Sequence, residues 1–262
     1  MVWSRLLSWG RLLGAGALIL GAGALLAAGR LILAFAPKTY LRWRGWLFRR
    51  GSQKVLAVLG FDVRVSGPAP RSPYLLVTNH LSYMDVLVLA SQLGCVFVAK
   101  AEIRGWPVLG PICRWFGTIF INRQERRDIP RVTAELEAAL GRELGVVIFP
   151  EGTSSAGAGL LPFRSPLLAP AARLGIPVHY AALGYETVPG DPPAYLAVCW
   201  WGNTPFAPHV VNLVRLRRVT ATIDFGEEPI VEPDRKFLAV RLREAVLEKF
   251  RPVTDEDPVP DA

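Results

Sequence analysis

The sequence predicts an α/β fold in which helices flank a central sheet, preceded by a helical segment that anchors the chain in a membrane. Three observations lead to this prediction. Short apolar runs of strand length alternate with amphipathic stretches of helical period between residues 59 and 251. An uncharged run, Leu12–Gly29, stands near the N-terminus. The 262-residue chain is also 51% hydrophobic, which is high for a freely soluble protein.

The uncharged run has the length of a membrane helix. Its residues would form a helix about 27 Å long, and the apolar stretch Leu31–Ala36 continues it beyond Arg30. A cleaved signal peptide is the alternative, but the basic and aromatic stretch that follows favours an anchor. Whether residues 12–36 span the membrane or re-enter it stays open.

Small residues recur along this run at alternating spacings of four and three, which places them on one face of a helix. Such a face lets a second helix approach closely, although glycine and alanine are also simply common here. The face comprises Gly10, Gly14, Ala17, Gly21, Ala24 and Ala28.

The stretch Lys38–Val58 mixes tryptophan and phenylalanine with six arginines or lysines, the composition of a helix lying at a lipid headgroup surface. Nucleic-acid binding uses similar residues, but a membrane-length neighbour argues against it. Residues 1–61 carry nine basic and no acidic side chains, whereas the remainder carries 21 basic and 22 acidic ones. This asymmetry predicts a main domain on the cytoplasmic face of the inner membrane.

The domain boundaries follow from these patterns. We assign residues 1–58 to the membrane helix and interfacial helix, 59–251 to the main domain, and 252–262 to a disordered acidic tail. The predicted strands are Phe61–Val65, Tyr74–Thr78, Val96–Ala99, Gly117–Arg123, Val146–Phe149, a strand from Ile176, Tyr195–Trp200 and Val219–Phe225. The predicted helices are Ser82–Gln92, a helix ending at Gly141, Pro166–Leu174 and Asp234–Phe250.

A histidine and an aspartate stand five residues apart at the first strand-to-helix turn of this domain. On one helix, His80 and Asp85 would lie about 140° apart, so they must straddle an element boundary. Ser82 has the position of a helix N-cap with Asp85 at the third position, from which the carboxylate folds back toward His80. A carboxylate so placed fixes the tautomer of a general base. Alternatively, Asp85 only caps the helix and His80 is a loop histidine.

Four motifs in chain order resemble those of the glycerolipid acyltransferases. They are Asn79-His80-x4-Asp85, the strand ending in Arg123, the turn Pro150–Ser155 and the strand start Ile176-Pro177-Val178. The resemblance implies a mixed sheet of the glycerol-3-phosphate acyltransferase type. It also implies transfer of an acyl chain from acyl-CoA or acyl carrier protein to 1-acylglycerol 3-phosphate, giving phosphatidic acid, with no cofactor, no metal and no nucleic acid. Membrane lipids are the implied partners.

By the same resemblance, His80 and Asp85 are the catalytic residues. The implied substrate-binding residues are Asn79, Ser82, Arg123, Glu151, Gly152, Thr153 and Arg164. An acyl-serine route through Ser82 or Ser154 is chemically unneeded, because a thioester is already activated. The aromatic and basic stretch Lys100–Phe116 fits either a core or a surface facing the acyl chain and membrane.

The chain departs from the commonest third motif at Ser154, where the family usually has arginine; Arg164 is the candidate replacement. The serine form is similar to relatives that acylate lyso-aminolipids such as lyso-ornithine lipid, which remains an alternative acceptor. A non-catalytic lipid-binding membrane protein is an alternative of a different class.

The remaining titratable candidates are predicted to be structural. His179 and His209 lie in apolar segments and are interpreted as packed histidines. Cys95, Cys113 and Cys199 show no paired spacing, so we expect reduced core residues and neither disulfides nor a metal site.

Overall fold

The computed structural model describes residues 2–122 and 128–255. Its strands are β1 Phe61–Ser66, β2 Tyr74–Thr78, β3 Cys95–Lys100, β4 Ile119–Ile121, β5 Gly145–Ile148, β6 Val178–Thr187 and β7 Val219–Phe225. Its longer helices are α1 Val2–Ile32, α2 Pro37–Leu59, α3 Met84–Gln92, α5 Asp128–Gly141, α8 Phe206–Leu213 and α9 Arg235–Lys249. The short ones are η1 Ala101–Gly105, α4 Leu109–Trp115, η2 Ser165–Leu168, α6 Ala169–Leu174 and α7 Ala194–Ala197.

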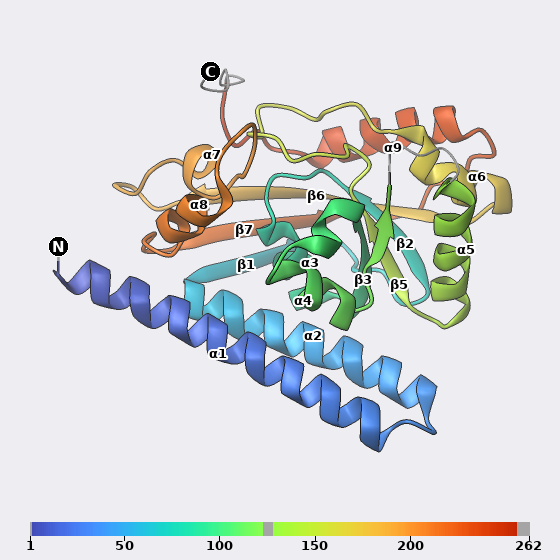
Figure 1. Cartoon of the computed structure of the whole chain (residues 1–262). Coiled ribbons are helices and arrows are strands. Elements are labelled where there is room, and N and C mark those ends of the chain that lie inside the picture. The colour runs from blue at the N-terminus through green and yellow to red at the C-terminus, as the bar shows by residue number, and fades with distance from the viewer. Residues whose placement is uncertain (1, 123–127, 256–262) are drawn as a thin grey trace.

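The strands form one sheet in the order β1-β7-β6-β2-β5-β3-β4 (Figure 1). The strands from β6 to β4 in that order are parallel, whereas β7 runs antiparallel to β6 and pairs in parallel with β1. The predicted α/β fold with a mixed sheet flanked by helices is therefore confirmed. Parallel neighbours also align the carboxyl ends of β2 and β5, which brings the first and third motifs to one edge of the sheet.

Each face of the sheet carries its own hydrophobic core. One core joins the sheet to α2 and α3 and to the segment containing α7 and α8. The other joins it to α5, α6 and α9. All five residues of β2 are buried because helices cover both of its faces, which explains why Tyr74–Thr78 reads as an unbroken apolar run.

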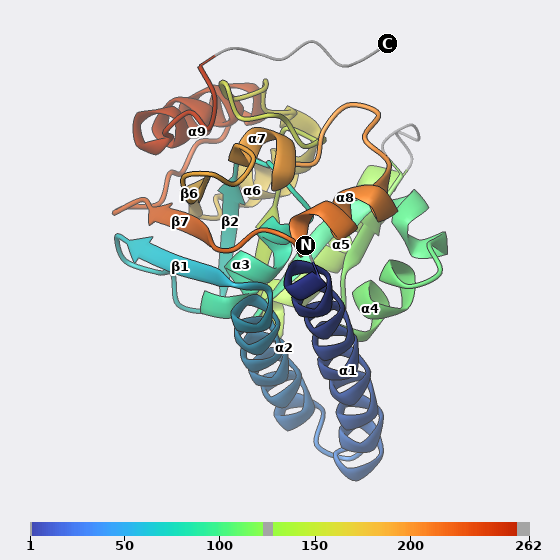
Figure 2. The same ribbon diagram turned by 90° about the vertical axis from the view of Figure 1, so that its left-hand side faces the viewer.

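The first two helices form a hairpin that projects from the rest of the molecule, with its turn farthest from the sheet (Figure 2). Glycines let the two helices and their neighbours approach closely, because a side chain at Gly29 would collide with the Trp43 ring and one at Gly23 with the Trp115 ring. Near the start of α1, Arg11 donates hydrogen bonds to the carbonyl oxygens of Val214 and Arg217 at 3.1 Å. The hairpin is thus tied to the domain at its open end.

The face of α1 that makes these contacts differs from the predicted small-residue face. Ala15, Gly23, Leu26 and Gly29 are buried, whereas most of the predicted face is exposed. A side chain added at Gly10 or Gly21 would meet nothing within 4 Å. The prediction chose the wrong face because tryptophans on α2 and α4 need glycines opposite them, a requirement that spacing within α1 does not reveal.

The domain boundary predicted at residue 58 separates elements that share a core. Phe48, Val55, Leu56 and Leu59 of α2 are buried in the same cluster as the strands. The later half of α2 therefore packs as part of the domain. Only the half nearer the hairpin turn is free to lie at a membrane surface.

Two further predictions need correction. The predicted strand Tyr195–Trp200 is instead the short helix α7 followed by an irregular segment, in which the Trp200 amide donates to the Leu81 carbonyl at 2.8 Å. Ala197, Val198 and Cys199 of this segment are buried by packing and do not pair in the sheet. The predicted tail begins in an ordered state, since the Val253 amide donates to Gly157 at 2.8 Å; residues 256–262 lie outside the described part.

Candidate active site

The turn after β2 is held in place by an asparagine whose side-chain amide makes the hydrogen bonds that a backbone peptide group would make in a strand. The Asn79 side-chain amide donates to the Leu183 carbonyl at 3.0 Å and accepts from the Leu183 amide at 2.7 Å. These two bonds extend the pairing of β2 with β6 by one position. Since Asn79 is 0% exposed, it fixes the direction in which the chain leaves the sheet and presents the next residue, His80, at the edge.

His80 and Asp85 are brought together as the spacing predicted. The distance from His80 Nδ1 to Asp85 Oδ2 is 2.7 Å, and Asp85 lies in the first turn of α3. The same oxygen accepts hydrogen bonds from the amides of Leu81 at 2.7 Å and Ser82 at 3.0 Å. Three donors therefore fix the carboxylate, and it in turn assigns the proton of the imidazole to Nδ1.

The other oxygen of Asp85 has a partner that the sequence did not reveal. Tyr185, on β6, donates its hydroxyl to Asp85 Oδ1 at 2.6 Å, and both side chains are buried. Burial and the neighbouring Asp85 charge raise the pKa of Tyr185 well above its usual value, so the phenol keeps its proton and remains a donor. With four donors around it, the carboxylate is held in one orientation beneath the histidine.

The histidine itself is half-buried. Its ring stacks on Phe149, the residue after β5, with centroids 4.1 Å apart, and the side chain is 22% exposed. Because Nδ1 is committed to Asp85, the lone pair of Nε2 is the basic atom available to a molecule outside. The arrangement is that of a general base suited to taking a proton from a hydroxyl.

The third motif lies beneath this histidine. The Glu151 Oε1 atom accepts from the His80 amide at 3.2 Å, and the side chain is 2% exposed. Burial raises the pKa of Glu151 to about 8, although the amides of His80 and Leu161 partly oppose that rise. Oε2 has no hydrogen-bond partner among the described residues. Glu151 thus connects the exit of β5 to the His80 turn as a largely neutral acid.

The next residues of the motif turn outward. Gly152 has a φ of 81°, a left-handed conformation that favours glycine, and Thr153 is exposed. The Ser154 hydroxyl donates to the Trp200 carbonyl, and the Ser155 amide donates to the His80 carbonyl at 3.0 Å. These bonds hold the third motif against both the His80 turn and the Trp200 segment.

The structure separates the predicted substrate-binding residues into three groups. Thr153 and Arg164 are exposed near the site, the Arg164 amide donating to the Pro150 carbonyl at 2.8 Å. Arg123 lies outside the described residues. The third group is buried beneath the histidine, so substrate binding by these residues stays a prediction; it comprises Asn79, Ser82, Glu151 and Gly152.

Ser82 also differs from its predicted role as a helix cap. The helix begins at Met84, and the Ser82 hydroxyl accepts only a long bond of 3.3 Å from the Met84 amide. Its side chain is 0% exposed. The cap position is displaced because Asp85 itself takes the free amides of this turn.

An aromatic cluster beside the histidine was not predicted as a unit. Tyr83, Trp106, Trp200 and Phe206 meet edge to face, with centroid distances between 5.0 and 6.2 Å. Each of these side chains is partly exposed. Because the residues come from four distant segments, only the folded chain assembles this apolar surface next to His80.

The other candidates are structural, as predicted. The Tyr83 hydroxyl lies 3.0 Å from His209 Nδ1, and His209 Nε2 donates to the Cys199 carbonyl at 3.0 Å, so both ring nitrogens are occupied. Burial lowers the pKa of His209, which keeps it neutral. The three cysteines are unpaired, and burial raises the pKa of the Cys95 thiol to about 12. The described residues contain no cluster of three or more His, Cys, Asp or Glu suited to a metal ion.

Comparisons with known proteins place this geometry in a family. A family model described as Acyltransferase matches residues 61–183. A lyso-ornithine lipid O-acyltransferase from Pseudomonas aeruginosa is 37% identical over 204 residues, covering 78% of this chain and 76% of the relative. The chain belongs to the acyltransferase family. A 1-acyl-sn-glycerol-3-phosphate acyltransferase from Neisseria meningitidis is 36% identical over 180 residues, covering 65% of this chain and 67% of the relative.

A solved structure supports the fold. The crystal structure of the 1-acyl-sn-glycerophosphate acyltransferase PlsC from Thermotoga maritima matches with a TM-score of 0.66 and 20% identity, covering 94% of this chain and 96% of that one. Its coverage shows that the hairpin and the sheet recur together. The protein is therefore an acyltransferase of the lysophospholipid type, and its relatives carry two different acceptor names.

Proposed function

We propose that this acyltransferase moves a fatty acyl chain from a thioester, acyl-CoA or acyl carrier protein, to the free hydroxyl of 1-acylglycerol 3-phosphate, giving phosphatidic acid. The observation that carries the proposal is the histidine–aspartate pair, 2.7 Å apart, with Nε2 as the available base. A protein that only bound lipids would not need a histidine base with an available ring nitrogen.

The reaction has two proton movements, both through His80. Nε2 takes the proton of the acceptor hydroxyl as its oxygen attacks the thioester carbonyl, and an oxygen–carbon bond forms. Collapse of the tetrahedral intermediate breaks the carbon–sulfur bond, and the leaving thiolate takes the proton back from the imidazolium. Asp85 stays ionised throughout and stabilises the imidazolium.

Direct attack is favoured over an acyl-serine intermediate. The Ser82 hydroxyl is buried, and the Ser154 hydroxyl is engaged with the Trp200 carbonyl. Within the described part of the chain, neither serine hydroxyl is hydrogen-bonded to His80. A thioester needs no prior activation, so the simpler route suffices.

Arg164 supports a phosphate-bearing acceptor. Its side chain is exposed in the segment that follows the third motif, and its backbone amide is bonded to the Pro150 carbonyl. A guanidinium there offers a forked set of donors to a phosphomonoester. Arg123, at the end of the second motif, is the proposed second contact.

Ser154 supports a second candidate acceptor, the hydroxyl of lyso-ornithine lipid. The serine that replaces the usual arginine is fastened to the Trp200 carbonyl, so its side chain adds no cation. Relatives named lyso-ornithine lipid O-acyltransferase also align over more of the chain, 80% in Rhizobium meliloti and 78% in Pseudomonas aeruginosa. The two candidates share the base and donor and differ only in the headgroup.

The hairpin supports attachment to a membrane by re-entry from one side, which we infer to be the cytoplasmic side. The helix segment Ser8–Ile32 is long and apolar enough to cross a membrane by length and composition. However, α2 returns along α1 and carries several arginines, which are costly in hydrocarbon. Exposed apolar residues gather at the hairpin turn, including Leu31, Ile32 and Phe35. Insertion of the turn alone satisfies both observations.

The deciding experiment is an acyl-transfer assay of the purified full chain with both thioester donors. The acceptor panel contains lysophosphatidate, lysophosphatidylglycerol and lyso-ornithine lipid, and His80→Ala serves as the inactive control. Transfer to lysophosphatidate with the highest kcat/KM supports the first acceptor, and preference for lyso-ornithine lipid supports the second. Absence of transfer to every acceptor would overturn the proposed activity.

A further inference from the structure

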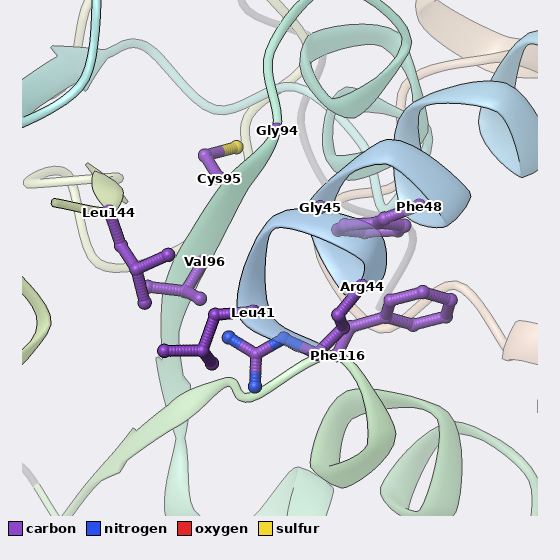
Figure 3. Close-up of a pocket in the computed structure, with 9 residues that line it drawn as sticks. All are labelled: Leu41, Arg44, Gly45, Phe48, Gly94, Cys95, Val96, Phe116 and Leu144. Carbon is purple, nitrogen blue, oxygen red and sulfur yellow. The ribbon is translucent and has the colours of Figure 1, made fainter. Parts of the chain in front are cut away.

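A shallow crevice lies at the root of the hairpin, beside the amino end of β3. His80 follows the carboxyl end of β2, so the crevice and His80 lie at opposite ends of the parallel strands. The crevice is formed where α2 crosses the beginning of β3, and it is a surface depression with no enclosed space large enough for a water molecule. Figure 3 shows the guanidinium of Arg44 extended across it beside Leu41 and Phe116. The walls are otherwise apolar or backbone, formed by Leu41, Gly45, Phe48, Gly94, Cys95, Val96, Phe116 and Leu144.

Arg44 is unusual because its charge has no counterpart. The side chain is partly buried, and no hydrogen bond or ion pair joins it to any of the described residues. Its guanidinium lies over Gly117, whose φ of 80° and missing side chain make room for it. A partly buried cation without an anion is costly, so a site of this kind favours occupation by an anion from outside.

The neighbouring charges increase this demand. Burial lowers the pKa of Arg44, and the nearby Arg142 lowers it further, while Tyr40 partly opposes both effects. The acidic residue of the same loop, Glu143, is paired with Arg42 at 3.6 Å. Arg44 lines the crevice from α2, Arg142 is exposed on the loop between α5 and β5, and the carboxylate of Glu143 is already paired with Arg42.

The position of the crevice indicates which anion it meets. Leu41 and Arg44 belong to the part of α2 where the hairpin leaves the domain, between the buried Leu47 and the exposed apolar residues of the turn. If the turn enters a bilayer, this level coincides with the lipid headgroups. The crevice is too shallow to enclose an acyl chain, so a ligand would be held by its headgroup while its chains stay in the membrane.

We propose that Arg44, assisted by Arg142, binds the phosphate of an anionic phospholipid headgroup at the root of the hairpin. This site is separate from the His80 centre and takes a structural lipid, not a substrate. It rests on the proposed membrane attachment but not on the proposed acyl transfer. Bound lipid would neutralise the two arginines and fix the angle at which the hairpin leaves the domain.

The test measures thermal unfolding of the full chain in a neutral maltoside detergent during titration with short-chain lipids. The probes are dioctanoyl phosphatidylglycerol, dioctanoyl phosphatidylcholine and inorganic phosphate. The variants are Arg44→Gln and Arg44→Lys, with Arg50→Gln as the matched control. Arg50 lies on the same helix but is exposed, and its guanidinium donates to Gln53 at 3.2 Å.

Phosphatidylglycerol is expected to raise the Tm of the wild type, and Arg44→Gln to weaken its apparent affinity about tenfold or more. The apparent affinity of Arg44→Lys for phosphatidylglycerol should lie between those of the wild type and Arg44→Gln. That of Arg50→Gln should stay within about twofold of the wild-type value. Without added anion, Arg44→Gln should unfold at the same temperature as the wild type or higher, because it removes an unpaired charge. His80→Ala should keep the full lipid response, which separates this site from catalysis.

Equal responses of Arg44→Gln and Arg50→Gln to phosphatidylglycerol would overturn the proposal. So would an equal effect of phosphatidylcholine on the wild type, or a lower Tm of Arg44→Gln without anion, since that would make the guanidinium a structural donor. Inorganic phosphate distinguishes the source of the phosphate group. Stabilisation by the lipid alone supports a headgroup site, whereas equal stabilisation by inorganic phosphate supports a phosphate site open to soluble anions and rejects the lipid as its ligand.

Discussion

At the scale of single residues, the site depends on how completely Asp85 is satisfied. Its two oxygens accept from His80, Tyr185 and two backbone amides, all within 3.0 Å. A buried carboxylate with this many donors cannot change partners when substrate arrives. The orientation of the imidazole is therefore set before the acceptor hydroxyl binds, which is the preorganisation that general-base catalysis needs.

Replacing His80 by alanine should lower kcat by about 10²–10⁴-fold with little change in thermal stability, because the base is lost from a half-exposed position. Asp85→Asn should lower kcat substantially as well, because the amide no longer specifies the Nδ1 tautomer. Steady-state kinetics with a fixed thioester donor and circular dichroism of each variant provide the measurement. A folded His80→Ala variant with more than about a tenth of wild-type kcat would contradict the mechanism.

Tyr185→Phe should act on catalysis without touching substrate, because it leaves Asp85 Oδ1 buried without its donor. We expect a loss of about 1–3 kcal/mol in stability and a lower kcat with unchanged KM. A carboxylate with one fewer hydrogen bond holds the protonated imidazole more strongly, so the acidic limb of the pH–rate profile should move to higher pH. Tyr180→Phe, on the same strand, is the control. A purely structural Tyr185 would lower stability and leave the profile where it was.

Glu151 predicts a pH dependence of stability. Burial raises its pKa from the ordinary 4.5 to about 8, so the folded state retains a proton that the unfolded chain releases. This contribution is fully present below about pH 4.5 and is lost as pH rises through about 8. Compared with the wild type, Glu151→Gln should therefore lose less stability over that interval. Urea unfolding at several pH values checks this, and parallel curves for the two proteins would refute it.

At the scale of elements, the hairpin is a packed part of the molecule as well as the proposed membrane anchor. Trp43 and Trp115 fit against Gly29 and Gly23 of α1, while the later half of α2 belongs to the core beneath the sheet. Arg11 links the start of α1 to the loop after α8. Movement of the hairpin is consequently coupled to the domain that carries the site.

Gly29→Ala should destabilise the protein by about 1–3 kcal/mol, because its methyl group would collide with the Trp43 ring. Gly21→Ala is the matched control on the same helix, where a side chain meets nothing within 4 Å. Since alanine favours helix, that control should be neutral or stabilising by up to about 1 kcal/mol. Thermal unfolding in detergent measures both, and equal effects would show that the two helices do not pack as described.

At the scale of the whole molecule, the basic residues and the exposed apolar turn both place the hairpin toward a membrane. The basic residues of the first 61 lie on the hairpin, whereas the rest of the chain is nearly neutral. Three of the exposed large apolar residues, Leu31, Ile32 and Phe35, lie at the hairpin turn, which is away from the sheet. A bilayer that receives the turn therefore meets arginines at its surface and leaves the domain in water.

Re-entry predicts how a cysteine at the hairpin turn reacts in intact membranes. Phe35→Cys should stay unreactive toward a membrane-impermeant maleimide from either side and become reactive in detergent. Glu248→Cys, on the exposed face of α9, should react from the cytoplasmic side and serves as the control. Both changes belong in a background in which the native cysteines are replaced by serine or alanine. Labelling of position 35 from the outer side would show a spanning helix.

The sequence by itself determined the elements whose signals are local. The five-residue spacing of His80 and Asp85 required a turn between them, and the apolar runs of β2 and β5 predicted the buried strands that deliver the first and third motifs. Their lengths and flanking residues also predicted the α/β fold and the N-terminal apolar helix. These features depend on backbone geometry over a few residues, which composition and spacing record directly.

Only the tertiary structure decided contacts between distant residues. Tyr185 reaches Asp85 across 100 positions, and the Asn79 side chain pairs with Leu183 across 104. The contact face of α1 and the unpaired charge of Arg44 depend on which elements pack beside them. Such pairings depend on the order of the strands in the sheet and on which helices pack against it. A single sequence contains no local signal for either of these. This is also why Glu151, taken as a ligand for substrate by resemblance, is found as a buried support of the turn that carries His80.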